Sequence, residues 1–189
     1  MVLMPLISAG SGLAGAWIGG HMTLRRDREG RHMEFVKAQL DEFYSPMLGI
    51  RAEIKAKSEA RVRVRDAFGQ LQVKADPSAQ RFIEEKYGST FEEMLKYDNE
   101  QLEKELLPLY RNMLEIFRQK AALAEESTMT HYLAFVEFVE VWNRRIQGSL
   151  PARVAEALGH GEAKLHPLYE DLETQLRALR AQLRHRRNA

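Results

Sequence analysis

The feature that most constrains this chain is an uncharged stretch at its beginning. Between Val2 and Leu24 there is no Asp, Glu, Lys or Arg, and the basic segment RRDREGR follows directly. At about 1.5 Å of rise per residue, a helix of this length crosses a hydrocarbon core of roughly 30 Å. We therefore predict a transmembrane anchor over residues 1–24 and a basic juxtamembrane segment over residues 25–33.

The position of the positive charges predicts the orientation of the anchor. A secretory signal peptide carries its positive charge before the apolar core, whereas only Met1 precedes this one. Positive charge that follows a span favours the cytoplasm for that side. We expect a single-pass protein of the inner (plasma) membrane, with its N-terminus outside and its helical domain cytoplasmic. The arginines expected at the membrane surface are Arg25, Arg26, Arg28 and Arg31.

Small residues recur within the predicted anchor at intervals of four. This spacing lets two helix backbones approach closely in lipid, which would allow anchors to self-associate. Glycine and alanine are also common in membrane helices that do not pair, so both interpretations remain open. The residues of this anchor-packing stripe are Gly12, Gly15, Ala16, Gly19 and Gly20.

The remainder of the chain has helical periodicity, and we predict an all-α fold. In this fold the N-terminal transmembrane helix leads into an antiparallel helical bundle, residues 34–187, with kinked long helices. Pro46 and Pro108 each fall inside an apolar stripe and cannot donate a backbone hydrogen bond, which predicts a kink near Tyr44 and either a kink or a break near Leu107. The two stripes are Val36, Leu40, Phe43, Met47, Ile50 and Ile54, and then Phe91, Leu95, Leu102, Leu106, Leu109, Met113 and Ile116.

Glycine, proline and hydroxyl residues predict the boundaries of the other helices. A helix should start at Pro77 and end at Gly88, and Thr128 or Thr130 should start the most apolar helix. We expect that helix to be the centre of the bundle, because its apolar face is wide. Its predicted face consists of Tyr132, Phe135, Val139, Trp142 and Ile146, widened by Leu133, Val136, Phe138 and Val141. Gly148 should end it, and Pro151 should start a short helix.

The last helix carries apolar residues in a heptad pattern for nearly three repeats. This pattern is compatible with a coiled-coil partner and so defines a possible assembly seam. For so short a run, packing against the chain's own bundle is the commoner arrangement, and we favour it. The seam comprises Leu165, Tyr169, Leu172, Leu176, Leu179 and Leu183.

The sequence offers little catalytic chemistry. GSGLAG from Gly10 to Gly15 matches a dinucleotide-binding fingerprint, but no second buried strand follows it, as that fold requires. A single Glu-x-x-His pair, Glu29 and His32, does not make a di-iron site. His131 stands at the start of the most apolar helix, where a cap or core role is commoner than a catalytic one. We predict no catalytic residue, metal or cofactor.

Three segments resemble a loose group of uncharacterised bacterial proteins. They are AQLDEFYSPMLGIR (Ala38 to Arg51), ELLPLYRNMLEIFRQKAALAEE (Glu105 to Glu126) and HYLAFVEFVEVW (His131 to Trp142). The resemblance implies a single N-terminal membrane helix followed by a cytoplasmic all-helical domain, and it implies no activity.

Together these features predict a non-enzymatic, membrane-tethered helical module for protein–protein interaction or self-assembly. Its expected partners are the lipid bilayer and either another protein or further copies of the chain. Nucleic acid is not expected, because 28 basic residues are balanced by 27 acidic ones. The alternatives are an oligomerising membrane effector or sensor and, with less support, a nucleotide- or metal-dependent enzyme.

Overall fold

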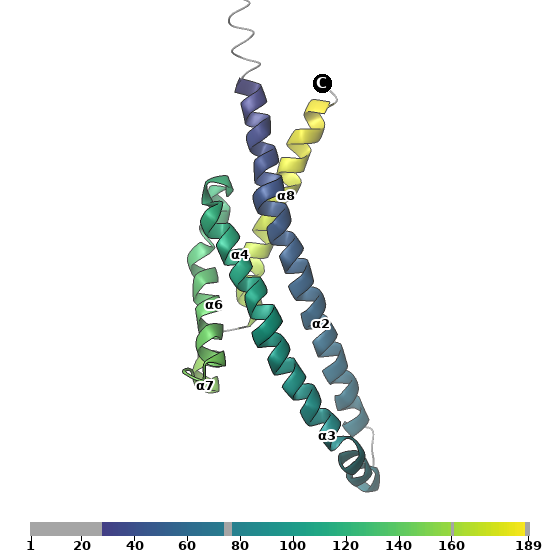
Figure 1. Ribbon diagram of the computed structural model, residues 1–189. Coiled ribbons are helices and arrows are strands. Elements are labelled where there is room, and N and C mark those ends of the chain that lie inside the picture. The colour runs from purple at the N-terminus through teal and green to yellow at the C-terminus, as the bar shows by residue number, and fades with distance from the viewer. Residues whose placement is uncertain (1–27, 74–76, 160, 188–189) are drawn as a thin grey trace, which may run out of the picture.

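The computed structural model describes residues 28–73, 77–159 and 161–187, and the secondary structure in these ranges is helical (Figure 1). The all-α class of the predicted fold is therefore confirmed for these residues. No helix in these ranges is long and apolar enough to cross a membrane. The predicted anchor, with Arg25 and Arg26, lies outside them.

Two long helices form the frame of the molecule. The first runs from residue 28 to Val73 and the second from Pro77 to Gln119, and each contains a π-helical segment. Shorter helices follow in the second half of the chain, before a final long one. In chain order after the first helical residues, 28–38, the elements are η1 (Gln39–Tyr44), α2 (Ser45–Val73), α3 (Pro77–Gln101), η2 (Leu102–Leu106), α4 (Leu107–Gln119), η3 (Ala121–Leu123), α5 (Glu126–Met129), α6 (Tyr132–Ile146), α7 (Ala152–Ala157), η4 (Glu162–Leu165) and α8 (His166–Arg187).

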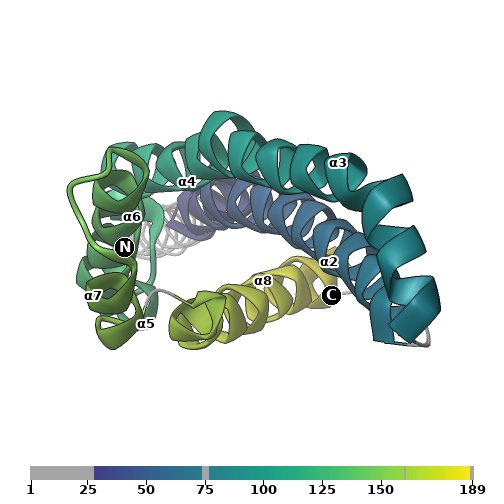
Figure 2. The same cartoon turned by 90° about the horizontal axis from the view of Figure 1, so that it is seen from below.

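The helices pack in layers. In the view from below, α2 lies between α8 on one side and α3 with α4 on the other (Figure 2). Helix α6 packs on α4, on the side away from α2 (Figure 1). Residue 28 and the end of α8 lie at one end of the molecule, and the junction of α2 with α3 lies at the other. The described termini therefore share one end of the bundle.

Both predicted proline irregularities are π-helical turns. In η1 the backbone N–H of Ser45 donates to the carbonyl of Leu40, and in η2 that of Leu107 donates to the carbonyl of Leu102. A proline ring clashes with the carbonyl four residues before it, and those carbonyls fall inside the two π turns. The wider turn accommodates the ring, so the second stripe belongs to one continuous helix rather than to two.

The buried core forms where the first helix, α4, α6 and α8 meet. Phe43 is the centre of an aromatic group, with its ring edge-to-face on Tyr44 at 4.9 Å and on Phe117 at 5.3 Å between centroids. Such edge-to-face pairs add to the free energy gained from burial alone. The other fully buried large side chains of the core include Met47, Ile54, Leu106, Met113, Phe135, Leu165, Leu168, Tyr169 and Leu172.

The expectation that α6 is the central helix is wrong. Its inner face is buried at Phe135, Phe138, Val139 and Val141, but Leu133 is 77% exposed and Val136 is 37% exposed. Among the described elements α6 contacts α4, α7 and η4, and it lies outside α4 rather than between two layers, so part of its surface stays exposed. Tyr132, Trp142 and Ile146 are partly buried against the core.

Two predicted helix boundaries are also wrong. Gly88 lies inside α3, which continues to Gln101. A glycine inside a helix costs only about 1 kcal/mol relative to alanine, which is too little to end α3 at this position. Helix α6 begins at Tyr132, after the separate turn α5, and not at Thr128 or Thr130.

The other boundary predictions hold. Gly148 follows the end of α6 with φ of +70°, a conformation that favours glycine, and Pro151 precedes α7. The heptad face, which begins at Leu165 in η4 and continues along α8, packs within the chain, as we favoured. Leu165, Tyr169, Leu172 and Leu179 are buried, and Leu176 and Leu183 pack partly buried against the core.

Candidate functional site

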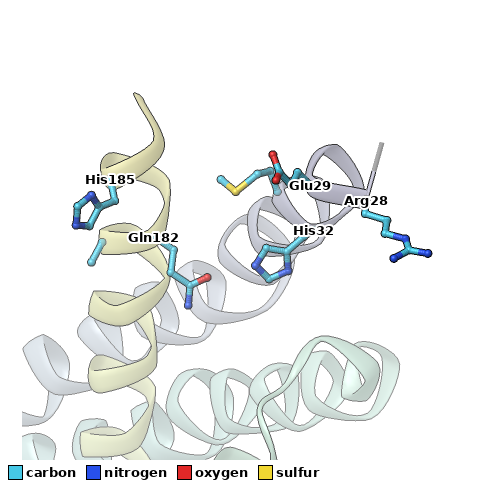
Figure 3. A pocket seen from close by; sticks show the side chains of 7 residues that line it. Arg28, Glu29, His32, Gln182 and His185 are labelled. Atoms are coloured by element: carbon cyan, nitrogen blue, oxygen red, sulfur yellow. The ribbon is translucent and has the colours of Figure 1, made fainter. Parts of the chain in front are cut away.

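A hollow separates the two terminal helices at their shared end of the molecule. It has a volume of about 880 Å³ and lies between the first turns after residue 28 and the end of α8. In Figure 3, His32 and Gln182 point toward the space between these helices, whereas Arg28 and His185 point away from it. The lining residues are Arg28, Glu29, His32, Met33, Ala181, Gln182 and His185.

A second hollow lies on the outer side of α8 and is strongly basic. Its volume is about 530 Å³, and its lining residues are Arg177, Arg180, Ala181, Arg184 and His185. After Glu173 the chain contains no further Asp or Glu. Among the described side chains, Arg177 forms an ion pair with Glu173 at 3.9 Å, and no such pair involves Arg180 or Arg184. This end of α8 therefore presents guanidinium groups to solvent.

The two histidines and Glu29 that line the first hollow do not form a metal centre. Within the ranges that the structure describes, no cluster of His, Asp and Glu side chains could hold a metal ion. Glu29 and His32 are not joined by the further ligands that a metal would need. What this end of the molecule offers is a concentration of positive charge, which suits the binding of anionic groups.

A chain of buried hydrogen bonds joins the first helix to α5 and α8. The backbone N–H of Glu125 donates to the Tyr44 hydroxyl at 2.9 Å, and the Thr128 hydroxyl donates to the carboxylate of Asp171. The hydroxyls of Tyr44 and Thr128 lie 3.0 Å apart. Because the single proton of Thr128 is used on Asp171, Tyr44 is the donor between them. All three groups are thereby satisfied.

Gln39 anchors the same region from the other end of η1. Its side chain is 3% exposed, and its Nε2 donates to the carbonyl of Leu123 at 3.0 Å and to the carboxylate of Glu125 at 2.9 Å. Buried amides that are paired in this way restrict a segment to one arrangement. The connection between α4 and α6 is therefore fixed on the first helix and on α8.

Burial controls the ionisation of three tyrosines around this core. Burial raises the pKa of Tyr44, partly offset by its hydrogen bond to Thr128. Burial also raises the pKa values of Tyr110 and Tyr169 far above the ordinary tyrosine value. The Arg51 guanidinium lies 4.3 Å from the centroid of the Tyr169 ring and pairs with Glu173. These groups hold α8 against α2.

The distal ends of α2 and α3 form a two-helix arm, which we define as residues 58–73 and 77–100. Lys57 at its base bonds to Glu105 at 2.8 Å, and this hydrogen bond raises the pKa of Lys57. Phe68 and Phe91 meet between the two helices at 6.5 Å. Large apolar side chains of the arm are nevertheless exposed, with Tyr97 at 61%. The others are Val62, Val64, Tyr87 and Leu95.

The structure places the sequence-predicted site residues at different points. Arg28 and Arg31 are exposed at the end that holds the hollow. His131 precedes the first residue of α6 and is half-buried. The small-residue stripe, Gly12, Gly15, Ala16, Gly19 and Gly20, lies outside the described residues.

Sequence reasoning missed Arg177, Arg180, the buried Gln39 and the buried hydrogen bonds of Thr128, which it considered only as a helix start. The absence of acidic residues after Glu173, together with arginines three and four residues apart, could have identified the α8 surface. No local signal identifies Gln39, because its partners are distant in the sequence.

Comparison with known proteins adds no functional assignment. No protein-family model, curated protein sequence or solved structure matches this chain.

Proposed function

We propose that this protein is a membrane-tethered cytoplasmic module that presents its two-helix arm for protein–protein interaction or self-assembly. The observation that carries the proposal is the placement of two features at opposite ends of the molecule. The described chain begins at residue 28, just after the uncharged stretch, beside the basic end of α8 (Figure 1). The arm lies at the far end, with its exposed apolar side chains.

This placement supports a tether at one end and a binding surface at the other. The large apolar side chains that the arm leaves exposed would be covered by a bound partner, which supports an interaction site there. The apolar seam of α8 is used inside the chain, which leaves the arm as the better-supported surface for assembly. A partner that binds the arm would therefore be separated from the bilayer by about the length of the first long helix.

The tether is tested by alkaline extraction of membranes that contain the full chain. We expect the chain to stay in the membrane pellet, because an apolar span is not released by breaking ionic contacts. Its recovery in the alkaline supernatant would contradict the tether. The measurement is an immunoblot of pellet and supernatant.

The arm is tested by photocrosslinking in the same membranes. A photoreactive residue in place of Tyr97, on the arm, should form adducts with a partner or with a second copy. The matched control is the same residue in place of Leu133, which is 77% exposed but lies on α6. Equal adducts at both positions, or none at Tyr97, would contradict the role of the arm, and the adduct mass distinguishes a second copy from another protein.

A further inference from the structure

The outer face of α8 carries three arginines that the packing of the bundle does not use. Arg177, Arg180 and Arg184 follow one another at spacings of three and four residues, so they share one side of the helix. The apolar residues Leu172, Leu176, Leu179 and Leu183 have the same spacing on an adjoining face, about 100° away around the helix axis, which packs toward the core. All three arginines are exposed. The guanidinium groups of Arg180 and Arg184 are therefore available to a partner outside the chain, and the exposed guanidinium of Arg177 is shared with Glu173.

Interaction with the helix dipole does not explain this arrangement. Positive side chains near a helix C-terminus do interact favourably with the dipole, but the effect is confined to the last turn. Helix α8 ends at Arg187, and Arg177 and Arg180 lie two or more turns before that end. Of the three arginines, only Arg177 forms an ion pair with a described side chain, at 3.9 Å from Glu173.

The location of this face indicates which anion it meets. The hollow lined by Arg28 and His185 shows that the end of α8 lies beside the first described turn of the chain. The uncharged stretch from Val2 to Leu24 ends only a few residues before that turn. A bilayer that contains this stretch would bring phospholipid headgroups to the end of α8. Guanidinium groups bind phosphate oxygens through paired, charge-assisted hydrogen bonds.

We propose that Arg177, Arg180 and Arg184 bind the phosphate groups of anionic phospholipid, giving the bundle a second contact with the membrane. This proposal rests on the tether proposed above. Each arginine near an anionic surface strengthens membrane contact by about fivefold, which corresponds to about 1 kcal/mol. Three such contacts would keep α8 at the headgroup layer and so set the orientation of the arm.

The experiment uses the full chain in lipid vesicles and a reporter on α8. The chain has no cysteine, so Ala181→Cys provides a single site for an environment-sensitive fluorophore among the arginines. The labelled chain is reconstituted into phosphatidylcholine vesicles and into vesicles in which about a third of the lipid is phosphatidylglycerol. We expect a blue shift of emission in the anionic vesicles only, abolished by salt at about 1 M, where the Debye length is about 3 Å.

Charge reversal tests the assignment to α8. Arg180→Glu with Arg184→Glu should lower the equilibrium constant for the docked state by at least about 25-fold, the loss expected for two contacts. The control, Arg63→Glu with Arg65→Glu, changes the net charge equally at exposed positions of α2, and it should keep the shift. Circular dichroism checks that both variants are folded, and Arg180→Gln with Arg184→Gln provides a milder version of the same test.

Several outcomes would overturn the proposal. A shift that is equal in both kinds of vesicle, or that survives the charge reversal on α8, would show that these arginines do not bind anionic lipid. A shift produced by inorganic phosphate or duplex DNA without lipid would assign the surface to a different ligand. Failure of the tether itself is measured separately, as failure of the chain to float with phosphatidylcholine vesicles.

Discussion

Tyr44 and Thr128 are 84 residues apart in the sequence, yet their hydroxyl oxygens lie 3.0 Å apart in the core of the bundle. This contact places the first helix, the turn α5 and, through Asp171, helix α8 in one chain of hydrogen bonds. Both side chains are fully buried. Loss of either hydroxyl would leave buried polar groups without partners, which is more costly than the hydrogen bond itself is favourable.

We therefore expect Tyr44→Phe and Thr128→Val each to lower the free energy of unfolding by about 1 to 3 kcal/mol. The double variant should lose less than the sum, because the two residues share one network. Thr174→Val, at an exposed position of α8, is the control and should have little effect. Urea unfolding followed by circular dichroism measures all four, and additive losses would show that the hydroxyls act independently.

Alkaline pH should destabilise the fold through its buried tyrosines. Burial raises the pKa values of Tyr44, Tyr110 and Tyr169, so the folded chain retains these protons to higher pH than the unfolded chain does. The free energy of unfolding should then fall as the pH rises above about 10, the ordinary tyrosine pKa. Tyrosinate absorbance should rise for these three residues together with the loss of helical circular dichroism. Their titration within a chain that stays helical would contradict the prediction.

The two faces of α6 should respond differently to truncation. Phe135 is fully buried and contacts the ring of Tyr110 at 6.4 Å between centroids, so Phe135→Ala should cost about 3 to 5 kcal/mol of stability. Leu133→Ala, two residues earlier at 77% exposure, should change stability by less than about 0.5 kcal/mol. Denaturant midpoints provide the comparison, and equal losses would mean that both faces of α6 are covered.

Replacement of Arg51 should show that its shape matters as well as its charge. The guanidinium stacks on Tyr169 and pairs with Glu173, and a lysine reproduces the charge but not the planar stack. We expect Arg51→Lys to destabilise the fold by about 1 kcal/mol. The reverse exchange, Lys55→Arg, lies at an exposed position one turn later and should be neutral. An Arg51→Lys midpoint equal to that of the unaltered chain would contradict a role for the stack.

The features of the fold that could be predicted from the sequence are those that depend on residues only a few positions apart in the chain. The stripe through Val36, Phe43 and Met47 is buried as expected, because residues three and four apart share a helix face wherever that face packs. Pro46 and Pro108 predicted the two irregular turns because a proline ring disturbs the helix only over the four residues before it. The conformation of Gly148 is likewise required by the local backbone.

The rest depends on contacts between distant segments. Apolar width suggested that α6 is central, but Leu133 is exposed because none of the described helices covers that side. Gly88 was predicted to end a helix, yet α3 continues through it to Gln101, because a single glycine costs a helix only about 1 kcal/mol. Gln39 has no distinguishing sequence pattern, since its partners Leu123 and Glu125 are brought to it only by the fold. The α8 arginines were visible in the sequence, but their position beside the first described turn was not.

The two π turns also determine the direction in which the arm faces. A π turn closes its hydrogen bond five residues back instead of four, so each one holds an extra residue relative to an α-helical turn. One residue corresponds to a rotation of about 100° around the helix axis. Deletion of a single residue from η1 would let that turn close as regular α-helix, so the side chains of α2 would keep their present faces, whereas a deletion within α2 itself would rotate every residue beyond it by about 100°. The angular setting of the exposed surface of the arm thus depends on the two π turns near the core, each of which takes up one extra residue.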